Sequence, residues 1–162
     1  MLGFSDLSVP FVSMRRSLLA PFPAPAWPAG IVLVPFASEH ALAAQALLVA
    51  AYAQGGGSVP ERFVPWWDAV SSDEEFDPAL CFVAMAEDGA MAGFALCWTS
   101  SFIKDIAVAS AHRRKGVGEA LLLSAFRELK ARGHQEVRLK VEAGNPSGAQ
   151  RLYERLGFVA AA

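Results

Sequence analysis

The sequence is short of the features that mark several protein classes. Two cysteines among 162 residues are too few for a disulfide framework, so we expect reduced core thiols and a cytoplasmic protein. A net charge of -2 gives no excess of lysine and arginine, which argues against a nucleic-acid-binding surface. The longest apolar helical stretch, Ala41 to Ala53, is well short of the ~20 residues that cross a bilayer. We therefore expect no membrane span and no nucleic-acid partner.

Apolar residues, in contrast, are abundant. They make up 54% of the chain, which is high for an isolated domain, so we expect a second subunit to cover part of the surface in a homodimer. A length of 162 residues suffices for one well-buried α/β domain and not for two comfortable ones. The sequence thus predicts a single folded domain.

Proline dominates the connection that precedes this domain. The segment from Pro21 to Pro28 can be neither a helix nor a central strand. Its prolines also interrupt the apolar stretch that an export signal behind Arg15-Arg16 would need. An apolar run, Leu7 to Met14, comes before it. We expect residues 1–30 to form a strand and a stiff connector, and residues 31–162 to form the domain.

Two helices are predicted early in the domain. After a β-branched strand at Ile31 to Pro35, Ser38 is placed to cap a helix that stops at Gly55-Gly56-Gly57. Pro60 then opens a shorter helix. One face of that helix carries an apolar stripe, which forms either core or the wall of a substrate pocket: Phe63, Trp66, Trp67 and Val70.

A meander of three strands follows. Leu80 to Ala86 and Met91 to Trp98 flank Glu87-Asp88-Gly89, a strong hairpin signal. If Asp88-Gly89 forms a two-residue turn, Cys81 lies opposite Leu96 and Cys97 points to the other face of the sheet. Phe102 to Ala109 is the third strand.

The run from His112 to Leu123 predicts a phosphate-binding loop that opens a helix. Arg113, Gly116 and Gly118 form an Arg-x-x-Gly-x-Gly pattern between the third strand and a helix over Glu119 to Arg132. Glycines let the backbone turn with its N–H groups inward, and the helix adds unpaired N–H groups and its positive dipole end. Neither the Gly-x-Gly-x-x-Gly pattern of dinucleotide-binding folds nor the Gly-Lys-Ser/Thr of nucleotide triphosphatases is present.

The remaining elements are a strand and a helix. Val137, Leu139 and Val141 alternate with polar residues and predict a strand with one polar face. Asn145-Pro146 supplies a cap and a first-turn proline for the last helix, which Gly157 ends. A strand, loop, helix and strand form a crossover unit behind the meander, so the sheet is expected to be mixed.

This combination resembles the GNAT superfamily of acetyl-CoA-dependent N-acetyltransferases. The matching residues are Asp105-Ile106-Ala107-Val108, the Arg113 to Gly118 loop, Asn145-Pro146 with Ala149, and Leu152-Tyr153-Glu154-Arg155-Leu156-Gly157-Phe158. The resemblance covers about residues 31 to 158. The spacing from Asn145 to Tyr153 is also similar to that of members related to mycothiol synthase.

The resemblance implies a fold and a cofactor site. The fold is an α/β (α+β) architecture with a mixed, mostly antiparallel sheet, helices on both faces and a splayed central strand pair that admits acetyl-CoA. The pyrophosphate would bind the glycine loop and the pantetheine arm would pair with the third strand of the meander. No metal is expected. The implied cofactor-binding residues are Ile106, Ala107, Val108, Arg113, Arg114, Lys115, Gly116, Val117, Gly118, Glu119, Asn145, Ala149 and Tyr153.

Acetyl transfer to an amine requires proton movements that few side chains here can provide. An alkyl ammonium with a pKa near ~10.4 must lose a proton before it attacks. Asp105 and Glu142 are the candidate bases, acting through water. Tyr153, which matches the family's helical tyrosine, is the candidate acid for the departing thiolate, because its phenol pKa is within ~2 units of that of the thiol.

The acceptor is less well defined than the donor. The expected reaction is direct attack by a primary amine of a small molecule or peptide in a ternary complex. Two alternatives remain open: a non-catalytic acetyl-CoA-binding domain, and transfer of another acyl group or transfer to a hydroxyl. GNAT domains normally continue beyond Gly-Phe into two more strands, whereas this sequence has four residues after Phe158. We expect the strand at Leu7 to Arg16 to fill part of that sheet edge, within the subunit or across a dimer.

Overall fold

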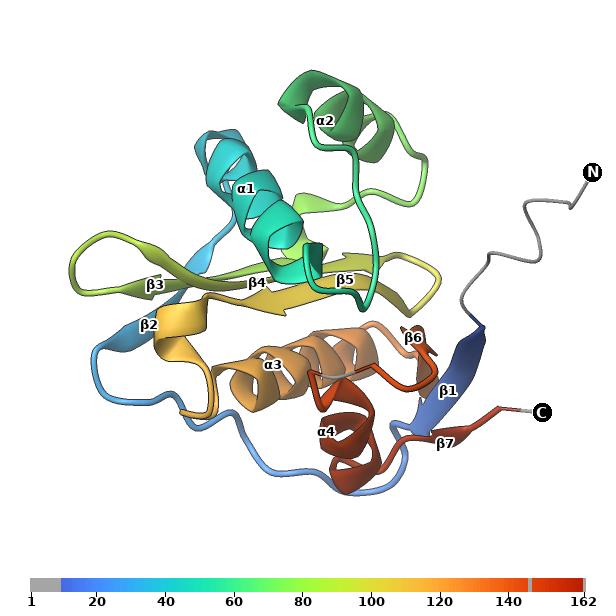
Figure 1. The fold of residues 1–162 in the computed structure, drawn as a ribbon. Coiled ribbons are helices and arrows are strands. Elements are labelled where there is room, and N and C mark those ends of the chain that lie inside the picture. Colours follow the sequence, from blue (N-terminus) through green and yellow to red (C-terminus); the bar gives the residue numbers. More distant parts are fainter. Residues whose placement is uncertain (1–9, 146, 162) are drawn as a thin grey trace, which may run out of the picture.

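The computed structural model describes residues 10–145 and 147–161, in which helices cover both faces of one sheet (Figure 1). The strands are β1 (Phe11–Ser17), β2 (Ile31–Pro35), β3 (Cys81–Ala86), β4 (Met91–Trp98), β5 (Phe102–Val108), β6 (Glu136–Glu142) and β7 (Val159–Ala160). The α-helices are α1 (Ala41–Tyr52), α2 (Phe63–Ser71), α3 (Val117–Ala131) and α4 (Ala149–Arg155). In Figure 1, α1 and α2 lie above the sheet and α3 and α4 below it.

The sheet has seven strands in the order β2-β3-β4-β5-β6-β1-β7. Every neighbouring pair is antiparallel except β5 and β6, which are parallel. These two strands pair only where they begin, at Phe102 with Arg138 and at Ile103 with Leu139. They separate from Lys104 onward. The predicted mixed sheet with a splayed central pair is therefore confirmed.

The N-terminal strand β1 lies beside β6 in the same chain. It pairs antiparallel along all of β6, from Phe11 opposite Glu142 to Ser17 opposite Glu136. The short strand β7 pairs with the other side of β1. Residues 7–9 of the strand expected at Leu7 to Arg16 lie outside the described residues. The described part of β1 thus extends the sheet beyond β6.

A buried arginine fastens β1 to the elements around it. Arg16 is 8% exposed, and its guanidinium lies 5.3 Å from the centres of the Phe22 and Phe126 rings. The same group donates hydrogen bonds to four backbone carbonyls, those of Leu156, Ser17, Ala20 and Pro21. Among the described residues, carbonyl dipoles and aromatic faces, and no carboxylate, thus stabilise its charge.

Apolar side chains form a cluster on each face of the sheet. Side chains of α1 and α2 build one, in which Trp66 and Val70 of the predicted stripe are buried, as the core interpretation requires, while Phe63 and Trp67 are partly buried and pack against it. Side chains of α3 and the end of α4 build the other. Cys81 belongs to the first cluster and Cys97 to the second, and both are buried free thiols, as predicted. No α-helix in the described part is long and apolar enough to cross a membrane.

The hairpin between β3 and β4 keeps the predicted register through two compensating differences. Ala86 pairs with Ala90 around a three-residue loop, so the predicted two-residue turn is wrong. Ala92 is then skipped, because Met85 pairs with Met91 and Ala84 with Gly93. Cys81 still lies opposite Leu96, since the extra residue on β4 cancels the longer loop.

The first two helices begin differently from the prediction, because side chains bond to the backbone before each of them. Ala37, and not Ser38, occupies the cap position of a short 3-10 turn before α1, and its N–H donates to Nδ1 of His40. The helix α2 begins at Phe63 rather than Pro60, since the carbonyl of Pro60 accepts a hydrogen bond from the Gln45 amide instead of a helical N–H.

The last helix also begins later than predicted. Its cap position is Gly148 and not Asn145, because Oδ1 of Asn145 accepts the N–H of Ser147 and closes a turn instead. Pro146 lies outside the described residues. The predicted end of this helix is confirmed: Gly157, with a φ of +101°, follows its last turn.

Candidate functional site

A bulge in β5 places a carboxylate where β5 leaves β6. Leu96 of β4 pairs with Asp105, whereas Cys97 pairs with Ile103. Lys104 is therefore an extra residue on β5, and it reverses the alternation of the strand. Ile103 packs in the cluster between the sheet and α3, while Asp105 faces α1 on the other side of the sheet. Without the bulge these two side chains would share a face.

Asp105 is buried and has two polar partners. Its Oδ1 accepts a 2.8 Å hydrogen bond from the Tyr52 hydroxyl at the end of α1. Its Oδ2 lies 2.8 Å from Nζ of Lys104. Burial raises the pKa of the Asp105 carboxyl, and the charge and hydrogen bonds of its two partners oppose that rise only in part. A carboxylate with a raised pKa is better suited to accept a proton near neutral pH.

Two phenols interact with this carboxylate, Tyr52 through its hydrogen bond and Tyr153 through the charge of Asp105. Tyr52 comes from α1 and Tyr153 from α4, on opposite faces of the sheet. Burial and the negative charge of Asp105 raise the pKa of Tyr153 to about 12. Burial and the same charge also raise the pKa of Tyr52. The Tyr153 pKa was expected to lie close to that of a thiol, about 8.5. This match is not found in the structure, because burial raises the pKa of the phenol away from that of the thiol.

Sequence reasoning missed Tyr52. The helix that carries it is apolar around its whole circumference, so its pattern does not reveal which side chain faces the sheet. The partner, Asp105, is 53 positions away, and its orientation depends on a bulge that no local pattern predicts. The signal that the sequence offered was a tyrosine three residues before a run of glycines.

The glycine segment after α1 contacts the end of β6. Oε2 of Glu142 accepts a 2.5 Å hydrogen bond from the N–H of Gly56. A Cβ on Gly56 would lie 2.9 Å from Nδ2 of Asn145. Glu142, a candidate base from its sequence position, thus accepts a hydrogen bond from the backbone of Gly56. It lies on β6, across the gap between the separated strands β5 and β6 from Asp105.

The loop between β5 and α3 presents unpaired N–H groups. Arg114 and Gly116 have φ angles of +62° and +93°, and among the described residues no side chain caps α3. Within that part of the chain, none of the N–H groups of residues 114–119 donates a hydrogen bond. A Cβ at Gly116 would meet no described atom within 4 Å. Such a loop at the start of a fifteen-residue helix has the donors and the dipole that an anion such as pyrophosphate requires.

Several of the other predicted cofactor residues lie in or next to this loop, with Val117 opening α3, whereas Asn145 lies beside Gly56. Ile106, Ala107 and Val108 lie on the stretch of β5 that does not pair with β6, which leaves one strand edge available to an extended ligand. Gly118 lies against Val108 and Leu152, so α4 approaches the loop. Arg113 donates to the Val108 carbonyl. Glu119 meets Arg155 at 3.4 Å, Ala149 opens α4, and Lys115 follows Arg114 in the loop.

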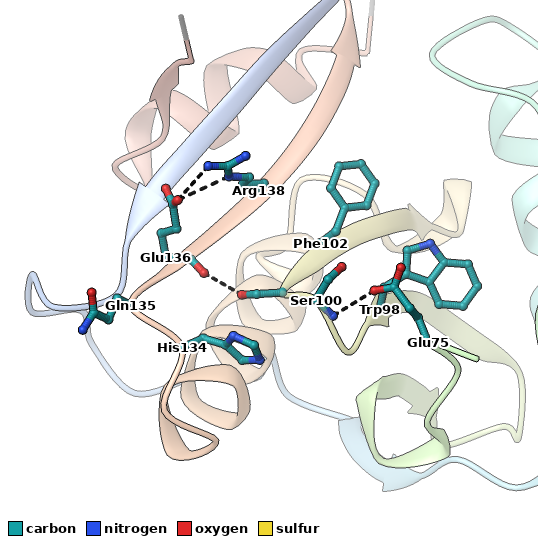
Figure 2. A pocket seen from close by; sticks show the side chains of 9 residues that line it. Glu75, Trp98, Ser100, Phe102, His134, Gln135, Glu136 and Arg138 are labelled. Carbon is teal, nitrogen blue, oxygen red and sulfur yellow. Dashed lines mark hydrogen bonds and ion pairs between the residues drawn. The ribbon is translucent and has the colours of Figure 1, made fainter. Parts of the chain in front are cut away.

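A cavity of about 560 Å³ lies at the opposite end of β5, beside Phe102 and Trp98 (Figure 2). Its polar groups bond to one another. Glu75 accepts the N–H of Ser100, Ser101 donates to the carbonyl of Glu136, and Arg138 meets the Glu136 carboxylate at 2.9 Å. None of the predicted site residues lines this cavity. Elsewhere in the described residues, no group of three or more His, Cys, Asp or Glu could hold a metal ion.

Comparison with known proteins agrees with this geometry. The profile of the Acetyltransferase (GNAT) family matches residues 44–158. A mycothiol acetyltransferase from Thermobispora bispora is 32% identical over 166 aligned positions, which cover 90% of this chain and 52% of the relative. The chain spans about half the length of the curated mycothiol acetyltransferases it matches.

Solved structures share the fold. A GCN5-related N-acetyltransferase from Sphaerobacter thermophilus superposes with a TM-score of 0.79 at 28% identity, covering 98% of this chain and 51% of that one. The ribosomal-protein-S18-alanine N-acetyltransferase from Escherichia coli superposes with a TM-score of 0.62 at 27% identity, covering 82% and 79%. The splayed strands, the unpaired loop and these matches together show that the chain belongs to the GNAT family of acetyltransferases.

Proposed function

We propose that this protein is an acetyl-CoA-dependent N-acetyltransferase, in which a primary amine of a small molecule or peptide attacks the acetyl group directly in a ternary complex. The observation that carries the proposal is the buried Asp105 carboxylate, hydrogen-bonded to Tyr52 at the point where β5 and β6 separate, on the strand that leads into a loop of unpaired N–H groups. The names of a mycothiol acetyltransferase and an alanine N-acetyltransferase among its relatives support an amine acceptor.

The loop and the free edge of β5 would bind acetyl-CoA. The N–H groups of residues 114–119 and the guanidinium of Arg114 suit the pyrophosphate, because both the backbone dipoles and the charge attract an anion. The backbone of Ile106 and Val108 would pair with the pantetheine arm and provide an N–H for the developing oxyanion. Binding thus depends largely on backbone groups.

Asp105 is the base in this proposal and Tyr153 the acid. The ammonium of the acceptor loses a proton toward Asp105, directly or through water, before its nitrogen attacks the acetyl carbon. The C–S bond then breaks, and Tyr153 donates its phenolic proton to the departing thiolate. The new amide nitrogen then loses its extra proton, which restores the phenol of Tyr153 through water, and Asp105 releases the proton it took from the ammonium to solvent. Asp105 suits its role because burial raises its pKa.

One observation favours a second candidate, a non-catalytic acetyl-CoA-binding domain. Both carboxylates near the gap are already engaged, Asp105 by Tyr52 and Lys104 and Glu142 by Gly56. In a binding domain these contacts would serve only to hold the two sheet halves in place. The binding loop would be unchanged.

A panel of primary amines separates these functions. The protein is incubated with acetyl-CoA and each amine, and both released thiol and acetylated product are quantified. We expect product from at least one class of amine, and Tyr153→Phe should reduce turnover much more than acetyl-CoA affinity. Binding of acetyl-CoA without any acetylated amine would favour the binding domain. Absence of acetyl-CoA binding would overturn both functions.

A further inference from the structure

The gap between β5 and β6 has a wall on each side. On the β5 side, the Tyr52 hydroxyl holds Asp105. On the β6 side, Glu142 and Asn145 stand at the end of the strand. The segment Gly55–Gly57, three residues beyond the end of α1, contacts residues of both sides. It is therefore placed to span the gap.

Each glycine of this segment meets a specific requirement. Gly55 and Gly56 have φ angles of +104° and +96°, which side chains rarely adopt. A Cβ on Gly56 would come within 2.9 Å of Asn145, and one on Gly57 within 3.1 Å of the Tyr52 ring. The sequence therefore provides a backbone that lies directly against both walls.

Glu142 holds this backbone through a hydrogen bond. Its carboxylate accepts the N–H of Gly56, and a bond from a backbone N–H to a carboxylate is charge-assisted. The backbone of Glu142 is itself fixed, because it pairs with Phe11 of β1. The carboxylate thus ties a flexible glycine segment to a rigid strand end.

We propose that Glu142 is a positioning residue, which holds Gly55–Gly57 across the gap as the wall against which the acceptor amine binds, and that it takes no proton from the amine. The proposal rests on the proposed acetyltransferase function and deepens it. The role needs an oxygen that accepts a hydrogen bond, whereas a base needs a carboxylate. An amide side chain meets the first requirement and fails the second.

Two substitutions of Glu142 therefore distinguish a positioning residue from a base. Glu142→Gln should keep kcat and the amine KM within about threefold of the parent, since the amide oxygen still accepts the Gly56 N–H. Glu142→Ala should raise the amine KM by about tenfold or more with a smaller change in kcat. The KM for acetyl-CoA should stay unchanged in both variants. Glu136→Ala, which removes a carboxylate at the other end of β6, is the matched control.

Amide hydrogen exchange tests the contact without any substrate. The Gly56 N–H should exchange about tenfold faster in Glu142→Ala and remain protected in Glu142→Gln. Unchanged exchange in Glu142→Ala would overturn the proposal. So would a Glu142→Gln variant that folds and loses activity as fully as the alanine variant. If the parent protein acetylates no amine, the proposed function fails, and the exchange rates still decide whether Glu142 holds the segment.

Discussion

The hydroxyl of Tyr52 donates a 2.8 Å hydrogen bond to Oδ1 of Asp105. Because this bond favours the charged carboxylate, Tyr52→Phe should raise the pKa of Asp105 further. The acidic limb of the kcat/KM profile against pH should then move to higher pH by about one unit. Initial rates measured from pH 5 to pH 9, ~0.5 unit apart, would resolve this shift.

The other groups that face Asp105 provide the control for this experiment. They are Lys104 on its own strand and Tyr153 from α4. Tyr153→Phe removes a neutral phenol that does not bond to Asp105, so it should lower kcat and leave the acidic limb in place. An acidic limb that does not move in Tyr52→Phe would separate Asp105 from the proton transfer.

Asp105 should also make the stability of the fold depend on pH. Its pKa is raised in the folded state, so the stability it contributes is fully present below its unfolded pKa, about 3.9, and is lost as pH rises through the folded value. Asp105→Asn lacks this loss. Its free energy of unfolding relative to the parent should therefore rise with pH from about pH 4 upward, as measured by urea unfolding at a series of pH values.

Asp77 provides a comparison of opposite sign. The N–H of Ala79 and the guanidinium of Arg132 lower the pKa of Asp77. Its contribution is present above its unfolded pKa and is lost as pH falls through the folded value. Asp77→Asn should therefore approach the parent in stability as the solution is acidified. If Asp105→Asn showed the same trend, the burial of Asp105 would not be the dominant influence on its pKa.

Local patterns explain why much of the fold could be predicted. The alternation of Val137, Leu139 and Val141 reports one buried face of β6, and all three are buried. The Arg113 to Gly118 loop was predicted because its glycines mark a turn that opens a helix, and the structure has that turn. Each of these signals lies within about ten consecutive residues and depends on no distant partner.

The relationships that could not be predicted join distant segments. The bulge at Lys104 depends on how β4 and β5 pair, and without it Asp105 would face away from α1. The start of α2 depends on Gln45, which binds the Pro60 carbonyl from another helix. The bond between Gly56 and Glu142 spans 86 positions. In each case the hydrogen-bond partner comes from a distant segment, which is close enough to bond only when the chain is folded.

Arg16 should be important for stability, whereas its neighbour Arg15 should not. Arg16→Met leaves four carbonyls without their donor and removes a cation from two aromatic rings. We expect a loss of about 2–4 kcal/mol in the free energy of unfolding. Arg15 is exposed on the same strand, so Arg15→Met should change stability by less than about 0.5 kcal/mol. Equal effects in urea unfolding would mean that the contacts of Arg16 contribute nothing beyond its charge.

Gly116 and Gly133 lie at the two ends of α3 and share one φ angle, so comparing them separates the effect of backbone strain from the effect on ligand binding. Both have a φ of +93°, and a Cβ at either would meet no described atom within 4 Å. Alanine at either position should therefore cost about 1–2 kcal/mol of stability through backbone strain alone.

Of these two glycines, only Gly116 lies in the loop with unpaired N–H groups. Gly116→Ala should weaken acetyl-CoA binding by about tenfold, because a shifted backbone no longer directs its N–H groups at the pyrophosphate, and Gly133→Ala should bind like the parent. Isothermal titration with acetyl-CoA measures both affinities at a temperature where each variant is folded, and equal affinities in the two variants would place the pyrophosphate away from this loop.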